Sequence, residues 1–217
     1  MEGELAMTLL PLTYFGNLEY YAHLMDDECR VEVCSNYEKQ TYANRCTIMG
    51  SNGVQDLTIP IAKPWHNTPI KEVRIAYDEP WQQMHWRALR AAYNSSPFFE
   101  FYGDELAVLY DKRWDFLVDF DLKTQEIALK LLKLEGITPT TTTAWEKSGK
   151  PGIKDCRNSL HPKKKVVPLH LNLGVEYYQV FAPKFGFVSN LSIVDLLMNL
   201  GNESRIYLRQ IINKQNR

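Results

Sequence analysis

The sequence predicts an α/β protein in which helices pack against a mixed sheet. Three observations lead to this fold class. A strand–helix–strand pattern fills the first forty residues, an Asn-Gly pair separates two apolar runs, and helical spacing of apolar residues dominates after residue 80. Because the helices cluster late in the chain while most strands come early, α+β is the close alternative.

The opening strand–helix–strand unit rests on two periodicities. The apolar run 8–10 stops at Pro11, and residues 29–33 alternate as a half-buried strand does. Between them, apolar side chains recur on one helical face at Leu18, Tyr21, Ala22 and Met25. A helical crossover between two strands predicts that they pair in parallel.

A central hairpin is predicted around Asn52-Gly53, which lies between the apolar runs 46–49 and 54–61. Both central positions of a type I′ turn need positive φ, which Asn and Gly adopt most easily. Helical patterns then follow after Pro80. We expect helices over 81–94, over 98–134 with a break near Asp119–Asp121, over 192–199 and over 202–212.

The length of 217 residues suits a single domain, 1–217, with one irregular segment at 138–165. This segment has no periodicity and contains four consecutive threonines, Thr140–Thr143. Residues 144–165 carry seven lysines and arginines against two acidic residues. We predict a flexible basic loop, which is either a solvated linker or a lid that folds over an anionic ligand.

Composition excludes several classes of partner. The 25 basic and 26 acidic side chains give a formal charge of -1, which argues against electrostatic capture of nucleic acid or an anionic membrane. No apolar run approaches the roughly 18–20 residues of a membrane span. The first residues, 1–4, lack the basic leader of a signal peptide, so we expect a cytoplasmic protein.

The four cysteines predict neither a disulfide framework nor a metal site. Their spacing contains no Cys-x-x-Cys pair, and the five histidines form no His-x-x-x-His pair. We expect reduced, mostly buried thiols at Cys29, Cys34, Cys46 and Cys156.

The loop 39–45 offers the clearest candidate binding residues. Lys39 and Arg45 are expected to point at a phosphate or carboxylate, and Tyr42 supplies a stacking surface. An ordinary solvated loop, with its arginine paired to an acidic residue, explains the same pattern.

His85 is the candidate acid or base, because the pKa of imidazole suits proton transfer near neutral pH. It shares a helical face with Trp81 and Ala88, so a hydrogen-bonded core histidine is the competing interpretation. Cys46 beside Arg45 is a second candidate, as a nucleophile whose pKa the neighbouring cation lowers.

Several residue runs in order along the chain resemble the WbqC-like protein family. They are Leu10–Gly16, Lys39–Arg45, Asn52-Gly53, Trp81-x-x-x-His85-Trp86, Tyr93–Phe99 and Asn190–Leu197. The resemblance runs from about residue 9 to residue 203. One departure is Ala43, where other members often carry arginine.

The resemblance implies a role in bacterial O-antigen or other surface-polysaccharide biosynthesis. It suggests transfer of a glycyl or related acyl group to a nucleotide-linked amino sugar in the cytoplasm. Five positions match family motifs and become the best site residues: Lys39, Asn44, Arg45, Asn52 and His85. In this hypothesis His85 takes the proton from the attacking amine, and Asn44 or Asn52 donates to the oxyanion.

Two other functions stay open. The first is a glycan- or protein-binding module of the same pathway, without turnover. The second is a nucleotidyl- or ligase-type enzyme, suggested only by the strand–helix–strand opening. For the transferase, the expected small-molecule partner is a nucleotide sugar or another anionic compound, whereas the binding module would hold a glycan or a partner enzyme. Neither a cofactor nor a protein partner can be named from the sequence.

Overall fold

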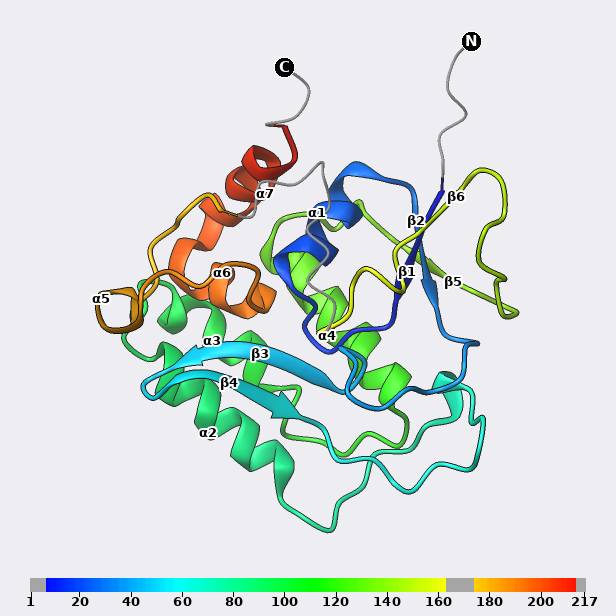
Figure 1. Cartoon of the computed structure of the whole chain (residues 1–217). Coiled ribbons are helices and arrows are strands. Elements are labelled where there is room, and N and C mark those ends of the chain that lie inside the picture. The colour runs from blue at the N-terminus through cyan, green and yellow to red at the C-terminus, as the bar shows by residue number, and fades with distance from the viewer. Residues whose placement is uncertain (1–6, 163–173, 214–217) are drawn as a thin grey trace.

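A computed structural model describes residues 7–162 and 174–213 of the chain (Figure 1). Its strands are β1 (Met7–Pro11), β2 (Cys29–Glu32), β3 (Arg45–Gly50), β4 (Gly53–Thr58), β5 (Thr140–Thr141) and β6 (Ile153–Asp155). Its α-helices are α1 (Leu18–Asp26), α2 (Trp81–Tyr93), α3 (Phe99–Ala107), α4 (Leu117–Leu131), α5 (Ala182–Phe185), α6 (Ile193–Leu200) and α7 (Ser204–Asn213). Two short 3-10 helices are Ile70–Glu72 and Gly201–Glu203.

The described strands form two separate sheets, and the α/β prediction is confirmed. The first sheet is parallel, with strand order β5-β2-β1-β6. The second is the antiparallel hairpin β3-β4, in which Gly50 pairs with Gly53. The parallel and antiparallel strands predicted from the sequence are therefore both present, but they do not share one sheet.

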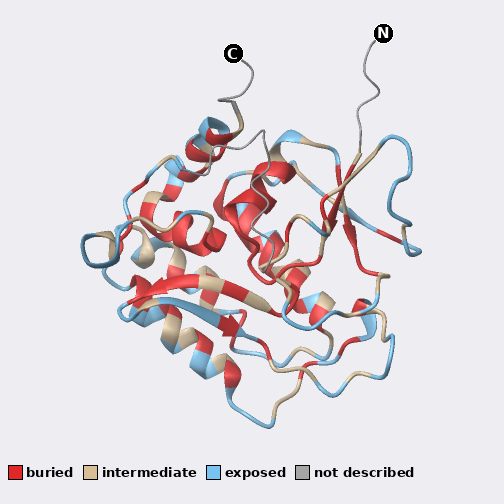
Figure 2. Ribbon diagram, in the orientation of Figure 1, coloured by how far each residue is buried: buried red, intermediate tan, exposed pale blue. Residues whose placement is uncertain are grey.

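The β1-α1-β2 unit forms as predicted. Asn17 caps α1 by accepting a hydrogen bond from the Tyr20 amide at 3.0 Å. The apolar face of α1 and the adjoining strand residues are buried at the centre of the molecule (Figure 2). Helices α6 and α7 contact α1 and complete this part of the core.

The hairpin packs separately, against helix α2. The predicted type I′ turn centred on Asn52-Gly53 is wrong in its details, because Gly50 pairs with Gly53 and the two loop residues are Ser51 and Asn52. Only Gly53 has the positive φ that was expected of both residues, 106°. Helix α2 buries Trp81, His85 and Leu89. Figure 1 shows the hairpin running across the lower half of the molecule, beside α2 and below the parallel sheet.

The helical region 98–134 is interrupted earlier than expected. The break predicted near Asp119–Asp121 is wrong, because α3 ends at Ala107 and α4 begins at Leu117 and runs through both aspartates. Asp119 lies in the first turn of α4, where the helix dipole favours a negative charge. The aspartates therefore mark the start of a helix and not its end.

The segment 138–165 also differs from the prediction. Strands β5 and β6 both lie inside it, and each pairs in parallel with the first sheet. The expectation of an irregular loop is therefore wrong over Thr140–Thr141 and Ile153–Asp155. These strands have only two and three residues, too few to show a period. Lys163, Lys164 and Lys165 lie outside the described residues.

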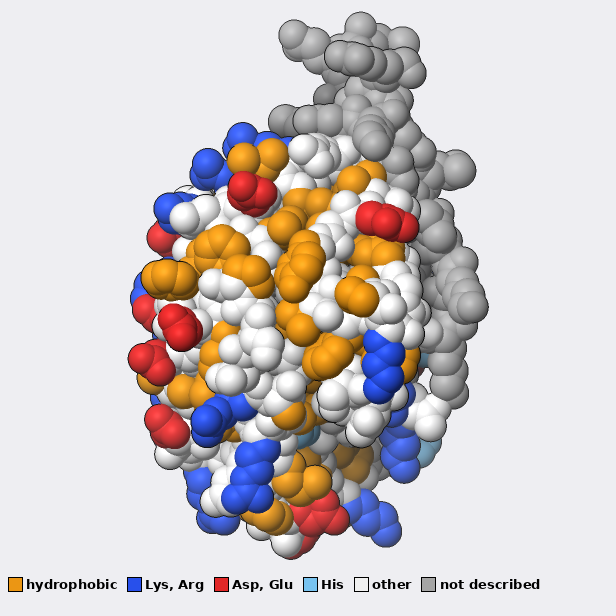
Figure 3. Space-filling view, turned by 90° about the vertical axis from the view of Figure 1, so that its left-hand side faces the viewer, with side chains coloured by type: hydrophobic (Ala, Val, Ile, Leu, Met, Phe, Trp, Pro, Cys, Tyr) orange, Lys and Arg blue, Asp and Glu red, His pale blue; other side chains and the backbone are white. Residues whose placement is uncertain are grey.

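One face of the molecule is rich in apolar side chains (Figure 3). This is the side on which α3, α5, α6 and α7 lie in Figure 1. It carries a hollow of about 420 Å³ whose lining includes Phe98, Phe101, Tyr102 and Leu131. In the described part of the chain, no helix combines the length and the apolarity needed to cross a bilayer.

Candidate functional site

A hollow lies at the carboxyl ends of the parallel strands, and we call it the carboxyl-edge pocket. The chain leaves β1 toward β2 on one side, whereas β6 pairs with β1 on the other. The connections therefore diverge at the carboxyl ends of the strands, which is where open parallel sheets bind ligands. The pocket has a volume of about 350 Å³. Its lining is Pro11, Leu12, Glu32, Ser35, Asn36, Glu38, Thr41, Tyr42, Ala43, Ile70, Trp145, Ser148, Arg157, Asn158, Leu160 and His161.

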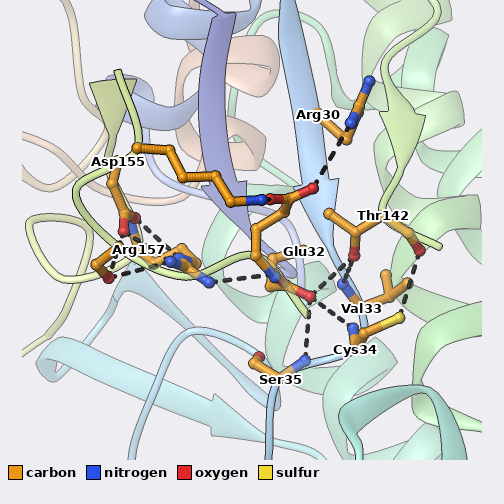
Figure 4. Close-up of polar contacts among 11 residues, drawn as sticks. Arg30, Glu32, Val33, Cys34, Ser35, Thr142, Asp155 and Arg157 are labelled. Atoms are coloured by element: carbon orange, nitrogen blue, oxygen red, sulfur yellow. Dashed lines mark hydrogen bonds and ion pairs between the residues drawn. The ribbon is translucent and has the colours of Figure 1, made fainter. Parts of the chain in front are cut away.

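Glu32, the last residue of β2, holds the walls of this pocket together (Figure 4). Its side chain is buried, with 1% of its area exposed. One oxygen, Oε1, accepts from the Cys34 amide at 2.7 Å, the Ser35 amide at 3.1 Å and the Thr142 hydroxyl at 2.8 Å. The other, Oε2, accepts from the Glu146 amide and Arg157 Nη1, both at 3.1 Å. A single carboxylate therefore joins the loops that follow β2, β5 and β6.

Arg157 completes this network from the loop after β6. Its Nε and Nη2 donate to the two carboxylate oxygens of Asp155 at 2.9 and 2.7 Å, a bidentate pair. These contacts raise the pKa of the Arg157 guanidinium and lower that of the Asp155 carboxyl. Nη2 also donates to Ser148 Oγ at 3.2 Å. Two carboxylates, Glu32 and Asp155, thus neutralise one guanidinium at the floor of the pocket.

Aromatic and uncharged polar side chains form much of the remaining lining. Both aromatic residues line the hollow, and Trp145 is 58% exposed whereas Tyr42 is half-buried. Amide and hydroxyl groups come from Asn36, Ser35 and Thr41, among others. Such a mixture of apolar faces and orienting polar groups is typical of small-molecule sites.

The first turn of α1 is not available to an anion. Its amides are taken up by protein acceptors: Leu18 N donates to Leu191 O, Glu19 N to Asn190 Oδ1, and Tyr20 N to Asn17 Oδ1. In dinucleotide-binding folds the equivalent helix terminus receives phosphate. In this chain the segment 190–192 covers that terminus.

Two of the predicted binding residues lie at the pocket. Tyr42 lines it directly. Lys39 is exposed in the turn between Glu38 and Thr41, both of which also line the pocket.

The other predicted binding residues belong to the hairpin. Asn44 is buried, and its Nδ2 donates to Ile59 O at 2.9 Å. Arg45 Nη1 lies 3.2 Å from Asp56 Oδ2 on the opposite strand. Asn52 is exposed at the tip, one six-residue strand away from Arg45. The structure therefore does not bring Asn44, Arg45 and Asn52 together with the pocket lining.

His85 lies in the core under the hairpin. Its Nδ1 is 3.1 Å from the Tyr14 hydroxyl and its Nε2 is 3.2 Å from Thr58 O. Burial is the main cause that lowers the pKa of His85, to about 4. The imidazole is therefore neutral at pH 7, and its contacts match those of a hydrogen-bonded core histidine. Proton transfer by His85 stays a prediction.

The proposed activation of Cys46 is wrong. Burial raises the pKa of this thiol instead of lowering it, because the thiolate would have to be desolvated. All four cysteines are free thiols. Among residues 7–162 and 174–213, no group of three or more His, Cys, Asp or Glu side chains is placed to hold a metal.

Sequence reasoning missed Glu32, Trp145 and Arg157. One signal was available for Glu32, which ends a predicted parallel strand, where functional side chains gather. No equivalent signal marked Trp145 or Arg157, because the strands beside them were not predicted.

Comparisons with known proteins agree with the resemblance found in the sequence. The family model described as the WbqC-like protein family matches residues 13–158. The chain is also similar to "Uncharacterized protein Rv1507c" of Mycobacterium tuberculosis, with 25% identity over 199 residues, covering 80% of this chain and 84% of that protein. No solved structure matches the chain. The range matched by the family model contains the hairpin, strands β2, β5 and β6 of the parallel sheet, and most of the pocket lining, whereas β1 lies before it.

Proposed function

This chain belongs to the WbqC-like protein family, and from that premise we propose that it is a transferase of bacterial surface-polysaccharide biosynthesis. In this proposal it moves a glycyl or related acyl group to the amine of a nucleotide-linked amino sugar. The acceptor sugar binds in the carboxyl-edge pocket. The use of a nucleotide sugar places the reaction in the cytoplasm, where such precursors are made.

The observation that carries the proposal is the position and lining of the pocket. It lies at the switch point of a parallel sheet and offers two aromatic rings among amide and hydroxyl groups. A sugar has apolar ring faces and a rim of hydroxyls, so this lining complements it. The volume of about 350 Å³ suits one sugar unit, with the nucleotide extending outward.

The transfer itself is a substitution at an acyl carbon. The amine nitrogen attacks the carbonyl carbon of an activated donor, the new C–N bond forms, and the bond to the leaving group breaks. A base takes the proton that the amine loses. His85 is the base predicted from the sequence, and it would need a route to the pocket that its present contacts with Tyr14 and Thr58 do not supply.

Group transfer is tested directly by incubating the purified protein with nucleotide-linked amino sugars and a panel of donors. Acyl-CoA thioesters and glycine with ATP cover the two usual kinds of activation, and mass spectrometry detects the acylated sugar. We expect product with at least one pair, and loss of that product in Tyr42→Ala. Exposed Lys112, which lies outside the pocket lining, gives the matched control Lys112→Ala.

A binding module without turnover is the second candidate function. One observation favours it: in the described residues, the pocket's Glu32 and Arg157 are already engaged with each other, and His85 is elsewhere. The base predicted from the sequence is therefore absent from the lining of the hollow. Binding of the nucleotide sugar without product from any donor would support the module over the enzyme.

A further inference from the structure

We infer that the carboxyl-edge pocket selects the amino-sugar ring itself, with the ring stacked on Trp145 and its ammonium group facing Glu38, while phosphate groups of the ligand stay outside. The inference rests on the proposed function, because only that proposal identifies the complete substrate as a nucleotide-linked amino sugar. The part that concerns ring recognition can be tested with simple glycosides.

The first step is the stacking surface. Trp145 lines the hollow and is 58% exposed, whereas the lining residues Leu12, Ile70 and Leu160 are buried, so Trp145 offers the most accessible apolar surface among them. Pyranose rings present C–H groups on one face, and these pack against aromatic rings. Tyr42 adds a second, half-buried ring to the same lining.

The pocket has one carboxylate without an ion-pair partner among the described residues, that of Glu38. The Arg157 guanidinium donates four hydrogen bonds, three of them to Asp155 and Glu32, so its charge is balanced before any ligand arrives. Glu38 is exposed and forms no ion pair with any described residue. The carboxylate of Glu38 therefore favours a cationic group on the ligand, such as a protonated amine.

The helix N-terminus that usually binds phosphate in such folds is occupied by protein acceptors. The first-turn amides of α1 donate to Leu191 O, Asn190 Oδ1 and Asn17 Oδ1. A phosphate at this helix would have to displace those acceptors. Lys39, exposed beside Glu38, is a cation next to the pocket lining and suits a phosphate that lies outside.

These steps predict the order of affinity among small probes. Methyl glucosaminide should bind more tightly than methyl glucoside, and inorganic pyrophosphate should not bind in the pocket. The dissociation constants follow from titration monitored by tryptophan fluorescence and by NMR. Trp145→Ala should weaken both glycosides by about tenfold, which corresponds to about 1.4 kcal/mol.

Glu38→Gln provides the specific test. It should leave methyl glucoside binding unchanged and remove the preference for methyl glucosaminide, a loss of about threefold for an exposed charge pair. Trp65→Ala is the matched control, since Trp65 is 88% exposed on a loop outside the pocket lining. Unfolding curves of the variants verify that each is folded.

The inference is overturned if neither glycoside binds at millimolar concentrations, if Trp145→Ala binds both as well as wild type does, or if pyrophosphate competes with the glycosides. It is separable from the proposed function. Glycoside binding through Trp145 without any acyl transfer would refute the transferase and keep the inference. Acyl transfer that continues unchanged in Trp145→Ala would support the transferase and refute the inference.

Discussion

The hairpin region and the carboxyl edge of the parallel sheet use polar residues in opposite ways. Under the hairpin, Asn44 and His85 direct their polar atoms at backbone carbonyls of the β4 strand end, so each contact fastens the fold. At the carboxyl edge, the buried Glu32 carboxylate accepts hydrogen bonds from the surrounding loops, while Trp145 and Glu38 line the hollow. A polar residue in a family motif can therefore serve packing, and residues that line a pocket can lie in segments without any pattern.

Removal of Glu32 should have the largest effect on the free energy of unfolding, and it tests the contrast between the two regions. Glu32→Ala leaves Arg157 and the amides of Cys34 and Ser35 without their buried acceptor. We expect a loss of about 3–5 kcal/mol in the free energy of unfolding, measured by urea denaturation. Glu105→Ala is the control, because its pair with Lys130 is exposed and should contribute under about 1 kcal/mol. Equal losses in the two variants would contradict a central role for Glu32.

A second prediction concerns the acid side of the stability profile. The pKa of His85 is lowered to about 4 in the fold, below its ordinary value of 6.5, so the folded state resists protonation. Stability from this residue is present above pH 6.5 and is lost as the pH falls toward 4, by about 3 kcal/mol. The difference in unfolding free energy between wild type and His85→Leu should show this dependence.

His66→Gln supplies the control for that profile, since His66 is exposed. It should follow the wild-type curve throughout. A flat difference curve for His85→Leu would mean that His85 is solvated in the native state. It would then be free for the proton transfer predicted from the sequence, and the contrast between the two regions would fail.

The length of each sequence pattern decided which helices and strands could be predicted. Helix α1 repeats its apolar spacing over more than two turns, and the hairpin is marked by Gly53 between two apolar runs, so both were predicted although the turn type was not. Strands β5 and β6 are too short to show a period and are held by pairing with β2 and β1. Such strands depend on contacts between distant segments, which no local pattern records.

The site was predicted in part for the same reason. Tyr42 was found because it sits in a loop whose composition is unusual. Glu32 and Arg157 come from β2 and the loop after β6, separated by more than 120 residues, and only the parallel pairing with β1 brings them together. The arginine in the 39–45 motif drew attention instead, although Arg45 forms a diagonal ion pair with Asp56 on the opposite strand.

A third, smaller effect tests the covered end of α1. Burial raises the pKa of Glu19 to about 7, while Asn190 donates to its carboxylate at 3.4 Å and opposes the shift. Because the folded pKa exceeds the ordinary value, stability from Glu19 is present below about pH 4.5 and is lost as the pH rises through 7. Glu19→Gln should therefore gain about 2 kcal/mol over wild type at pH 8 and little at pH 4. A gain that is the same at both pH values would show that the carboxyl is not buried in its charged form.

The smallest effect is expected at Arg45, and it bears most directly on the comparison. Arg45 and Asp56 form a partly exposed pair, with side chains 25% and 42% exposed, so Arg45→Met should cost at most about 1 kcal/mol and less at high salt. A double-mutant cycle with Asp56→Asn isolates that pair energy. Glycoside binding measured on the same variant should be unchanged, because Arg45 does not line the pocket. A tenfold loss of glycoside affinity in Arg45→Met would instead join the hairpin to the site, as the sequence motif predicts.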